Sequence, residues 1–233
     1  MLLAAVASVG ALAGAVTHGA LHRNSPLFGP VLARLPNEPG APPRIALTFD
    51  DGPNPEATRR ILDTLRDRGV RATFFVLGRH AERWPHLVRR IAEEGHALGN
   101  HGYHHRKLHL RGPRYVRRDL ELGTAAVERA GAGRPRLFRA PHGFRSPWVT
   151  AVARSLGQRT VGWTLGVWDS DRPGAAAIAK RTVDGARPGA IVVLHDGDGY
   201  DPGGDRSQTA EALPRIIDEL RARGFQFALI PES

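Results

Sequence analysis

Acidic and imidazole side chains follow several apolar, strand-like runs of the sequence, and these residue types can hold a divalent metal ion. Asp50 and Asp51 come directly after "RIALTF", a histidine pair follows "HALGN", and His195 follows "GAIVVL". Two histidines and one carboxylate suit Zn²⁺ or a similar ion and leave coordination positions open for chemistry. Since the chain has no cysteine, any metal must be held by His, Asp or Glu.

The histidine pair is identified by its position as much as by its spacing. His-x-x-x-His occurs three times, as His18/His22, His101/His105 and His105/His109, where composition alone predicts about 0.5 such pairs. The first pair lies in an apolar leader. His101 and His105 follow a strand end and a Gly-Asn turn, from which both imidazoles can point at one ion.

The remaining polar residues can serve separate steps of a hydrolysis reaction. One of the two adjacent aspartates can bind the metal while its neighbour accepts a proton from an activated water. His195 can protonate a leaving amine. Arg139, after the strand-like "RLFRA", can keep the base ionised and oriented. This set fits hydrolysis of an amide or an ester.

Strand and helix patterns alternate from residue 44 to the end of the chain. Expected strands cover residues 44–49, 71–78, 96–100, 136–140, 158–165, 189–196 and 225–231, and expected helices cover 55–69, 80–95, 114–131, 146–157, 174–186 and 207–224. The alternation predicts an α/β fold with about seven parallel strands and crossover helices. Without a dinucleotide fingerprint, it favours a distorted or incomplete (β/α) barrel, whose active site would lie at the carboxyl ends of the strands.

Five segments carry a family resemblance: "TFDDGP", "HGYHH", "RAPHG", "WDSD" and "VLHD". In this order they resemble the polysaccharide deacetylases of the NodB-homology type (carbohydrate esterase family four). The resemblance covers about residues 44–231. It implies a distorted (β/α) barrel and one divalent ion, with zinc as the default and cobalt, nickel or manganese as alternatives. It also implies removal of acetyl groups from N-acetylated, or less often O-acetylated, sugars of a polysaccharide.

The resemblance assigns roles to individual residues. Asp50 resembles the catalytic base and Asp51 the metal-binding carboxylate, with His101 and His105 as the two histidine ligands. Arg139 resembles the arginine that braces the base.

The resemblance also implies an acid and a substrate pocket. His195 resembles the general acid, and Asp169 the carboxylate that tunes it. Three further groups would contact the substrate. The backbone N–H of His142 would help bind the oxyanion, Val193 would line the acetyl-methyl pocket, and Trp168 would form another wall.

The chain departs from the family pattern at several positions. Gly102 stands where a Ser or Thr hydroxyl usually supports the metal loop, so a lower metal affinity is expected. His142 replaces a common Tyr, and Val193 replaces the usual Leu. No Trp follows the acid in "WDSDRPG", so Asp171 remains an alternative to Asp169.

The charge of the chain leaves rival functions open. Its net charge is +10, and Lys107 and Lys180 are its only lysines. A basic surface favours anionic partners, but the arginines are scattered and accompany no nucleic-acid motif, so no nucleic-acid partner is expected.

Two rival functions stay open beside the deacetylase. One rival is a hydrolase of another carbon–nitrogen bond, of the cyclic imide type. Another is a non-catalytic envelope protein that binds glycan or anionic polymer, which would need neither Asp50 nor His195.

The acidic loop "DGDGYDPGGDRSQT" is expected to be a solvated rim that could form one wall of a substrate cleft. Tyr200 stands where an EF-hand loop would need Asp or Asn, which disfavours a calcium site.

The N-terminus is expected to direct export. Residues 1–22 carry no Asp, Glu, Lys or Arg and are interpreted as a signal peptide or membrane anchor, with possible membrane contact. Residues 23–43 are interpreted as a linker that partly docks on the domain, and residues 44–233 as the catalytic domain itself. The expected location is the cell envelope, and the sequence leaves the oligomeric state open.

Overall fold

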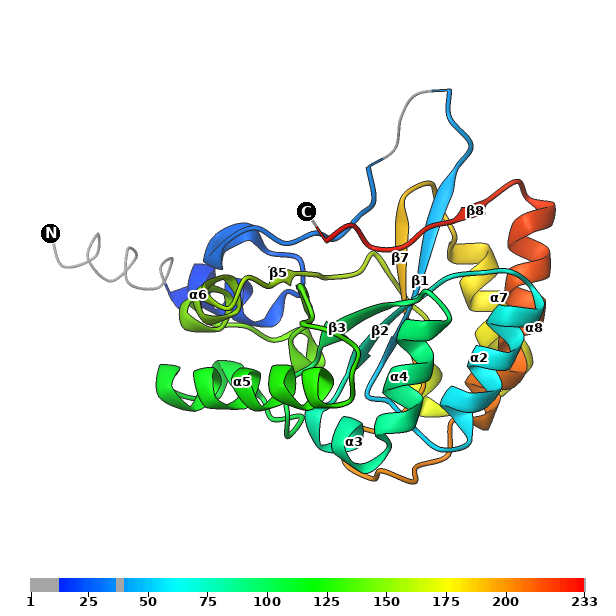
Figure 1. Ribbon diagram of the computed structural model, residues 1–233. Coiled ribbons are helices and arrows are strands. Elements are labelled where there is room, and N and C mark those ends of the chain that lie inside the picture. Colours follow the sequence, from blue (N-terminus) through cyan, green and yellow to red (C-terminus); the bar gives the residue numbers. More distant parts are fainter. Residues whose placement is uncertain (1–12, 37–39, 233) are drawn as a thin grey trace, which may run out of the picture.

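The computed structural model describes residues 13–36 and 40–232, which form a parallel sheet with helices packed mainly along one face (Figure 1). The strands are β1 (Arg44–Asp50), β2 (Thr73–Val76), β3 (Ala97–Asn100), β4 (Leu137–Phe138), β5 (Arg159–Thr160), β6 (Leu165–Gly166), β7 (Ala190–His195) and β8 (Gln226–Phe227). The α-helices are α2 (Ala57–Asp67), α3 (Gly78–Arg83), α4 (Pro85–Glu93), α5 (Pro113–Arg129), α6 (Pro147–Ser155), α7 (Ala175–Gly185) and α8 (Ser207–Ala222). Short 3-10 helices are η1 (Pro26–Phe28), η2 (Leu108–Leu110), η3 (Pro141–Gly143) and η4 (Asp169–Asp171).

The sheet is a curled, incomplete barrel, as the alternating pattern predicted. Its strand order is β5-β4-β3-β2-β1-β7-β6, and β8 pairs with the start of β1. Every paired strand is parallel to its neighbour. Strands β5 and β6 end this order and do not pair with each other, so the described strands leave the barrel open between them.

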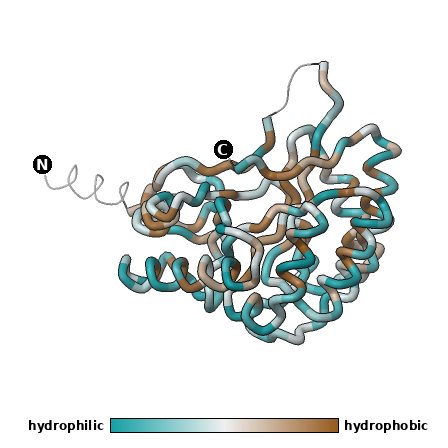
Figure 2. Tube along the Cα trace, viewed as in Figure 1, coloured by the Kyte–Doolittle hydropathy of each residue, from teal (hydrophilic) through white to brown (hydrophobic). Residues whose placement is uncertain are grey.

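The side chains of β1 point alternately to two apolar clusters, and this alternation fixes the side to which its last side chain, Asp50, points. Ile45, Leu47 and Phe49 belong to the cluster formed with helices α2, α7 and α8. Ala46 belongs to a second cluster, on the inner side of the curled sheet. In Figure 2, apolar residues lie along the strands of the sheet and recur at intervals along the helices. Because side chains alternate along a strand, Asp50 shares the inner side with Ala46.

Two expected elements are each broken in the structure. The helix expected over residues 80–95 is split into α3 and α4 at Trp84, which is non-helical (φ −131°, ψ 60°). The residue before a proline is disfavoured in helical conformation, and Pro85 begins α4. The strand expected over residues 158–165 is split into β5, which pairs with β4, and β6, which pairs with β7, and between them Gly162 donates to the carbonyl of Leu32 (2.9 Å) in the N-terminal segment.

The N-terminal segment packs on the domain well before residue 44. The buried Arg145 donates from its backbone N–H to the Ala20 carbonyl (3.0 Å) and from its guanidinium to the Ser25 carbonyl (2.7 Å). Leu35 is buried and donates to the Gly189 carbonyl (2.8 Å). Most of the expected leader, residues 1–12, lies outside the described residues. Among the residues that are described, no helix has both the length and the apolar character to cross a bilayer.

Candidate active site

Asp50 and Asp51 point in different directions although they are neighbours in sequence. Asp50 ends β1 on the inner side of the sheet, whereas Asp51 has a left-handed backbone (φ 73°) that turns its side chain away from the strand alternation. Gly52 follows, at a point where a Cβ atom would lie 2.1 Å from the Asp196 carboxylate. Only glycine fits this close approach, so the short turn brings both carboxylates into the same site.

Arg139 is completely buried and fixes Asp50. Its Nη1 donates to Asp50 Oδ1 (2.7 Å) and to Thr48 Oγ1 (2.7 Å), and its Nη2 donates to the Gly162 carbonyl (3.0 Å). The guanidinium lies 4.1 Å from the ring centroid of Phe75. A buried charge must be paired and hydrogen-bonded, so this arginine and Asp50 hold each other in one orientation.

Asp51, His101 and His105 form a buried cluster that suits a metal ion. The Nε2 atoms of His101 and His105 lie 3.3 and 3.1 Å from Asp51 Oδ1. One candidate ligand atom from each residue falls within 4.8 Å of the others. Asp51 Oδ1 is buried without a hydrogen-bond partner among the described residues. An orphaned anionic oxygen between two imidazoles is the arrangement that a bound cation would complete, so these residues fit a divalent ion.

A backbone carbonyl orients His101, and burial and neighbouring charges shift the pKa values of all three candidate ligands: burial lowers the pKa of His101, but the Asp50 and Asp51 carboxylates raise it above its usual value. His101 Nδ1 lies 2.8 Å from the Arg139 carbonyl, which assigns the proton to Nδ1 and leaves Nε2 free to coordinate. Burial lowers the pKa of His105 to about 3. Burial also opposes ionisation of Asp51, but the imidazoles of His105 and His101 hold the pKa of that carboxyl well below its usual range. The shifts at His105 and Asp51 favour a neutral imidazole and an ionised carboxylate, which are the states that bind metal.

A histidine–carboxylate pair lies at the end of β7, next to the end of β1. His195 Nδ1 is 2.9 Å from Asp169 Oδ1, and Asp169 Oδ2 accepts from the His195 backbone N–H (2.7 Å) and from Thr209 Oγ1 (2.9 Å). Burial opposes protonation, but the Asp169 carboxylate raises the pKa of His195 to about 9. The structure therefore pairs His195 with Asp169; no contact with Asp171 is found among the described residues.

The three substrate-side residues proposed from the sequence differ in their surroundings. His142 has a left-handed backbone (φ 60°), and its ring centroid lies 4.5 Å from that of His105. Val193 is buried on β7, beside Gly166 of β6. Trp168 is 69% exposed and therefore available to a bound ligand. Their contacts with substrate remain predictions.

The loop between His101 and His105 is held by groups other than a side chain at position 102. A Cβ at Gly102 (φ 79°) would lie 2.6 Å from Asp119 Oδ2, so a larger residue would collide with this carboxylate. Asp119, buried on α5, accepts from the backbone N–H of Tyr103 (3.0 Å), and Asn100 Oδ1 accepts from the Gly102 N–H (2.8 Å). Carboxylate and amide groups here hold the loop between the two histidines in the absence of a side-chain hydroxyl. The predicted effect of Gly102 on metal affinity remains a prediction.

Asp196 is a positioning residue to which the sequence interpretation gave no role. Its carboxylate accepts from the Gly52 N–H (3.1 Å) and from Thr58 Oγ1 (2.5 Å), and its own N–H donates to the Asp50 carbonyl (3.2 Å). Burial raises its pKa to about 7. These contacts tie the turn after β1 to the end of β7. The available signal was its place directly after His195, at the end of an apolar run.

Comparisons with known proteins agree with the residues gathered here. A family model for polysaccharide deacetylase matches residues 37–161. The chain is 38% identical over 193 residues to a peptidoglycan-N-acetylglucosamine deacetylase of Bacillus cereus, covering 81% of this chain and 86% of the relative. It is 37% identical over 208 residues to a chitooligosaccharide deacetylase of Sinorhizobium fredii, covering 87% and 97%. A solved family 4 carbohydrate esterase from Streptomyces lividans, in complex with acetate, superposes with a TM-score of 0.75 at 30% identity, covering 82% and 95%.

Proposed function

The chain belongs to the polysaccharide deacetylase family, and from this premise we propose that it removes acetyl groups from N-acetylated sugars of a cell-envelope or extracellular polysaccharide. The observation that carries the proposal is the arrangement around the Asp51, His101 and His105 cluster. An arginine-braced carboxylate, Asp50, and a carboxylate-paired imidazole, His195, end the adjacent strands β1 and β7. Hydrolysis of an amide needs a proton acceptor and a proton donor in this way.

We propose that Asp51, His101 and His105 hold one divalent ion. Zinc is the metal that such nitrogen and oxygen donors most often bind, and cobalt, nickel or manganese suit the same set. When bound, the ion supplies Lewis-acid polarisation of the acetyl carbonyl group. The chain's own residues then supply the proton transfers.

In the proposed reaction, a water molecule adds to the acetyl carbonyl carbon while Asp50 accepts a proton from it. Arg139 keeps that carboxylate in place. As the bond between carbonyl carbon and nitrogen breaks, the protonated His195 donates a proton to the departing nitrogen. The products are acetate and a free amino sugar. The backbone N–H of His142 is proposed to donate to the oxygen that becomes negatively charged during the addition.

Acetate release tests the proposed function directly. Metal-stripped, full-length protein would be incubated with peptidoglycan fragments and with N-acetylglucosamine oligomers, with and without added Zn²⁺ or Co²⁺. Acetate and free amine should appear in equal amounts, and only when metal is present. Absence of both from every acetylated glycan, with metal demonstrably bound, would contradict the proposal.

The pairing of His195 with Asp169 predicts a change in pH dependence. Asp169→Asn removes the charge that raises the pKa of His195 to about 9. His195 donates a proton only below its pKa, so the alkaline limb of kcat/KM should move to lower pH. The asparagine side chain can still accept from the Thr209 hydroxyl, which keeps the local packing.

A pH–rate profile across the neutral and alkaline range checks this shift. Asp171→Asn is the matched control, because it removes an aspartate from the same 3-10 helix without touching the pair. An alkaline limb that stays in place in Asp169→Asn, or that moves equally in both variants, would argue against the assigned roles.

We further propose that the protein is exported and acts at the cell envelope, with residues 1–22 as a signal peptide or anchor and a catalytic domain from residue 44. The apolar, uncharged leader supports export, and so does a relative named for peptidoglycan. The contacts of residues 20–35 with the domain support a segment that holds the leader close to it.

A further inference from the structure

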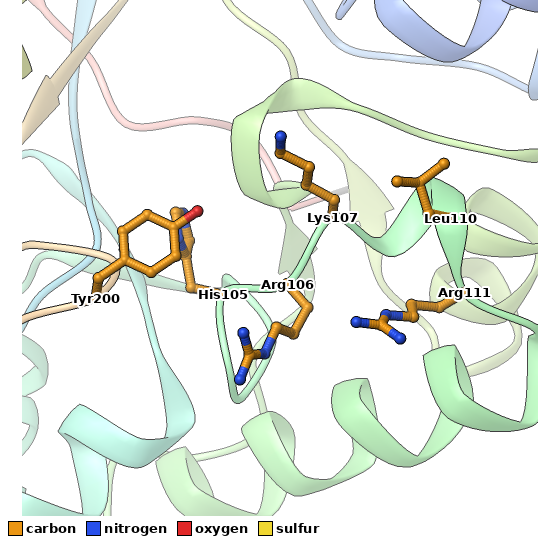
Figure 3. Close-up of a pocket in the computed structure, with 6 residues that line it drawn as sticks. All are labelled: His105, Arg106, Lys107, Leu110, Arg111 and Tyr200. Atoms are coloured by element: carbon orange, nitrogen blue, oxygen red, sulfur yellow. The ribbon is translucent and has the colours of Figure 1, made fainter.

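We propose that a groove beside His105 binds a carboxylate of the glycan, so that the chain favours acetylated sugars next to an acidic one. The groove has a volume of about 410 Å³ and is called here the cationic groove. It is lined by His105, Arg106, Lys107, Leu110, Arg111 and Tyr200 (Figure 3). This inference rests on the proposed deacetylase function and adds to it the class of glycan recognised.

The cationic groove begins at the proposed reaction centre. One of its walls is His105, whose Nε2 lies 3.1 Å from Asp51. Two other grooves found among the described residues lie around residues 69–71, near the amino end of β2, and share no lining residue with the centre. The proposal therefore places the sugars next to the acetylated one along the cationic groove, which borders the centre at His105.

Three positive charges line this groove without a compensating acid. Arg106, Lys107 and Arg111 are exposed, and none forms an ion pair with the described part of the chain. In Figure 3 the side chain of Arg111 extends toward Arg106, the side chain of Arg106 extends away from Arg111, and Lys107 points to the other side. Many arginines elsewhere pair with carboxylates, such as Arg68 with Asp218 (2.9 Å). An anion bound in the groove would offset these positive charges.

Three carboxylates near the groove-lining residues in sequence have partners of their own, and one of them, the exposed Asp201, accepts from the Gly203 N–H (2.9 Å). Asp119 is buried and accepts from the backbone N–H groups of Tyr103 and His104. Asp198, in the loop that carries Tyr200, is paired with Arg206 (2.9 Å). The groove lining itself contains no acidic residue. A ligand carboxylate would therefore meet no competing acid from the groove itself.

Two exposed side chains give the groove a surface for sugar rings. Leu110 is 72% exposed and Tyr200 is 63% exposed, although both are large and apolar. Tyr200 is held by contacts of its hydroxyl with His142 Nε2 (3.2 Å) and of its ring with His105. Apolar faces in a groove that is also lined by cations match a sugar chain that carries carboxylates. A guanidinium can also bind a carboxylate with two parallel hydrogen bonds.

The test compares two forms of one substrate. A peptidoglycan-derived oligosaccharide with a free carboxylate beside its N-acetylglucosamine is compared with its methyl ester, using zinc-loaded, full-length protein. Because a hydrogen bond to a charged group contributes more than a neutral one, kcat/KM should be about tenfold or more higher for the acid than for the ester. Added salt should reduce this preference, since the groove is open to solvent.

Variants identify the groove as the source of the preference. Arg106→Gln/Arg111→Gln should bring the acid-to-ester ratio of kcat/KM close to one. The control Arg89→Gln/Arg215→Gln removes the same charge from α4 and α8, and neither residue lines the groove. The control should keep the ratio of the unaltered protein.

Any one of three kinetic results would overturn the inference. They are equal kcat/KM for acid and ester, an acid preference that survives in Arg106→Gln/Arg111→Gln, and an equal loss of preference in the control. If neither substrate were hydrolysed, the deacetylase function would fail, and calorimetric binding of acid against ester would still decide the groove. The inference would also be overturned if the protein bound anionic lipid vesicles more strongly than either substrate and bound acid and ester equally. That result would assign the groove to a membrane surface instead.

Discussion

Asp50→Asn is expected to lower the rate of acetate release by about 10²–10⁴-fold, the usual contribution of a general base, while the protein still binds one equivalent of metal. Asparagine has the shape of aspartate and can accept the hydrogen bond from Arg139, but it cannot take up a proton from water. Asp50 is also not part of the cluster of candidate ligands. The substitution should therefore separate catalysis from metal binding.

Steady-state kinetics together with metal analysis of the same samples checks this result. Asp67→Asn is a matched control, since it removes an exposed aspartate of α2 that pairs with Arg66. A thermal melt shows whether Arg139, deprived of its buried counter-ion, still permits folding. If Asp50→Asn lost the metal together with activity, Asp50 would be a ligand. If it retained full activity, another group would be the base.

Removing one candidate ligand is expected to abolish both metal binding and activity. In His101→Ala the two remaining residues, Asp51 and His105, cannot complete a three-ligand set. In the unaltered protein, bound metal should stabilise the fold by about 2.7 kcal/mol when the free metal concentration is about 100 times Kd. For a domain of this size, that corresponds to a rise in Tm of about 5–10 °C.

The measurement is Tm with and without a chelator, together with acetate release. A chelator should lower the Tm of the unaltered protein and leave that of His101→Ala unchanged. His86→Ala, which removes an exposed histidine of α4, should keep both the response to chelator and the activity. Metal-dependent turnover by His101→Ala would show that the ion is held elsewhere.

The order and type of most elements could be predicted from the sequence, because parallel strands that are covered by helices leave continuous apolar runs. β1 and β7 lie where such runs were expected. The breaks at Trp84 and Gly162 have different causes. The first is local and follows from Pro85. The second lies where the chain changes its pairing partner from β4 to β7 and contacts Leu32, about 130 positions earlier in the chain, and such distant contacts leave no signal in the local sequence.

The chemical types at the site were also readable from the sequence, because a metal-dependent hydrolase restricts which side chains can follow the strands. Residue chemistry and family motifs together indicated Asp50, Asp51, His101, His105 and His195 before any geometry was known. The pairing of His195 with Asp169 required the structure. Asp169 and Asp171 lie in the same 3-10 helix, and the sequence does not show which of them reaches His195 at the end of β7. Asp196 required it as well, because its partners lie about 140 positions away.

What the sequence by itself determined is thus the set of chemical groups and the fold class, both of which depend on residue type and on local periodicity. What only the tertiary structure decided is direction and environment. The left-handed backbone of Asp51 turns it toward the histidines, and strand alternation points Asp50 to the buried Arg139. The cationic groove likewise exists only because a loop after β3 and a loop after β7 meet. Such features arise from contacts between distant segments, which no local pattern encodes.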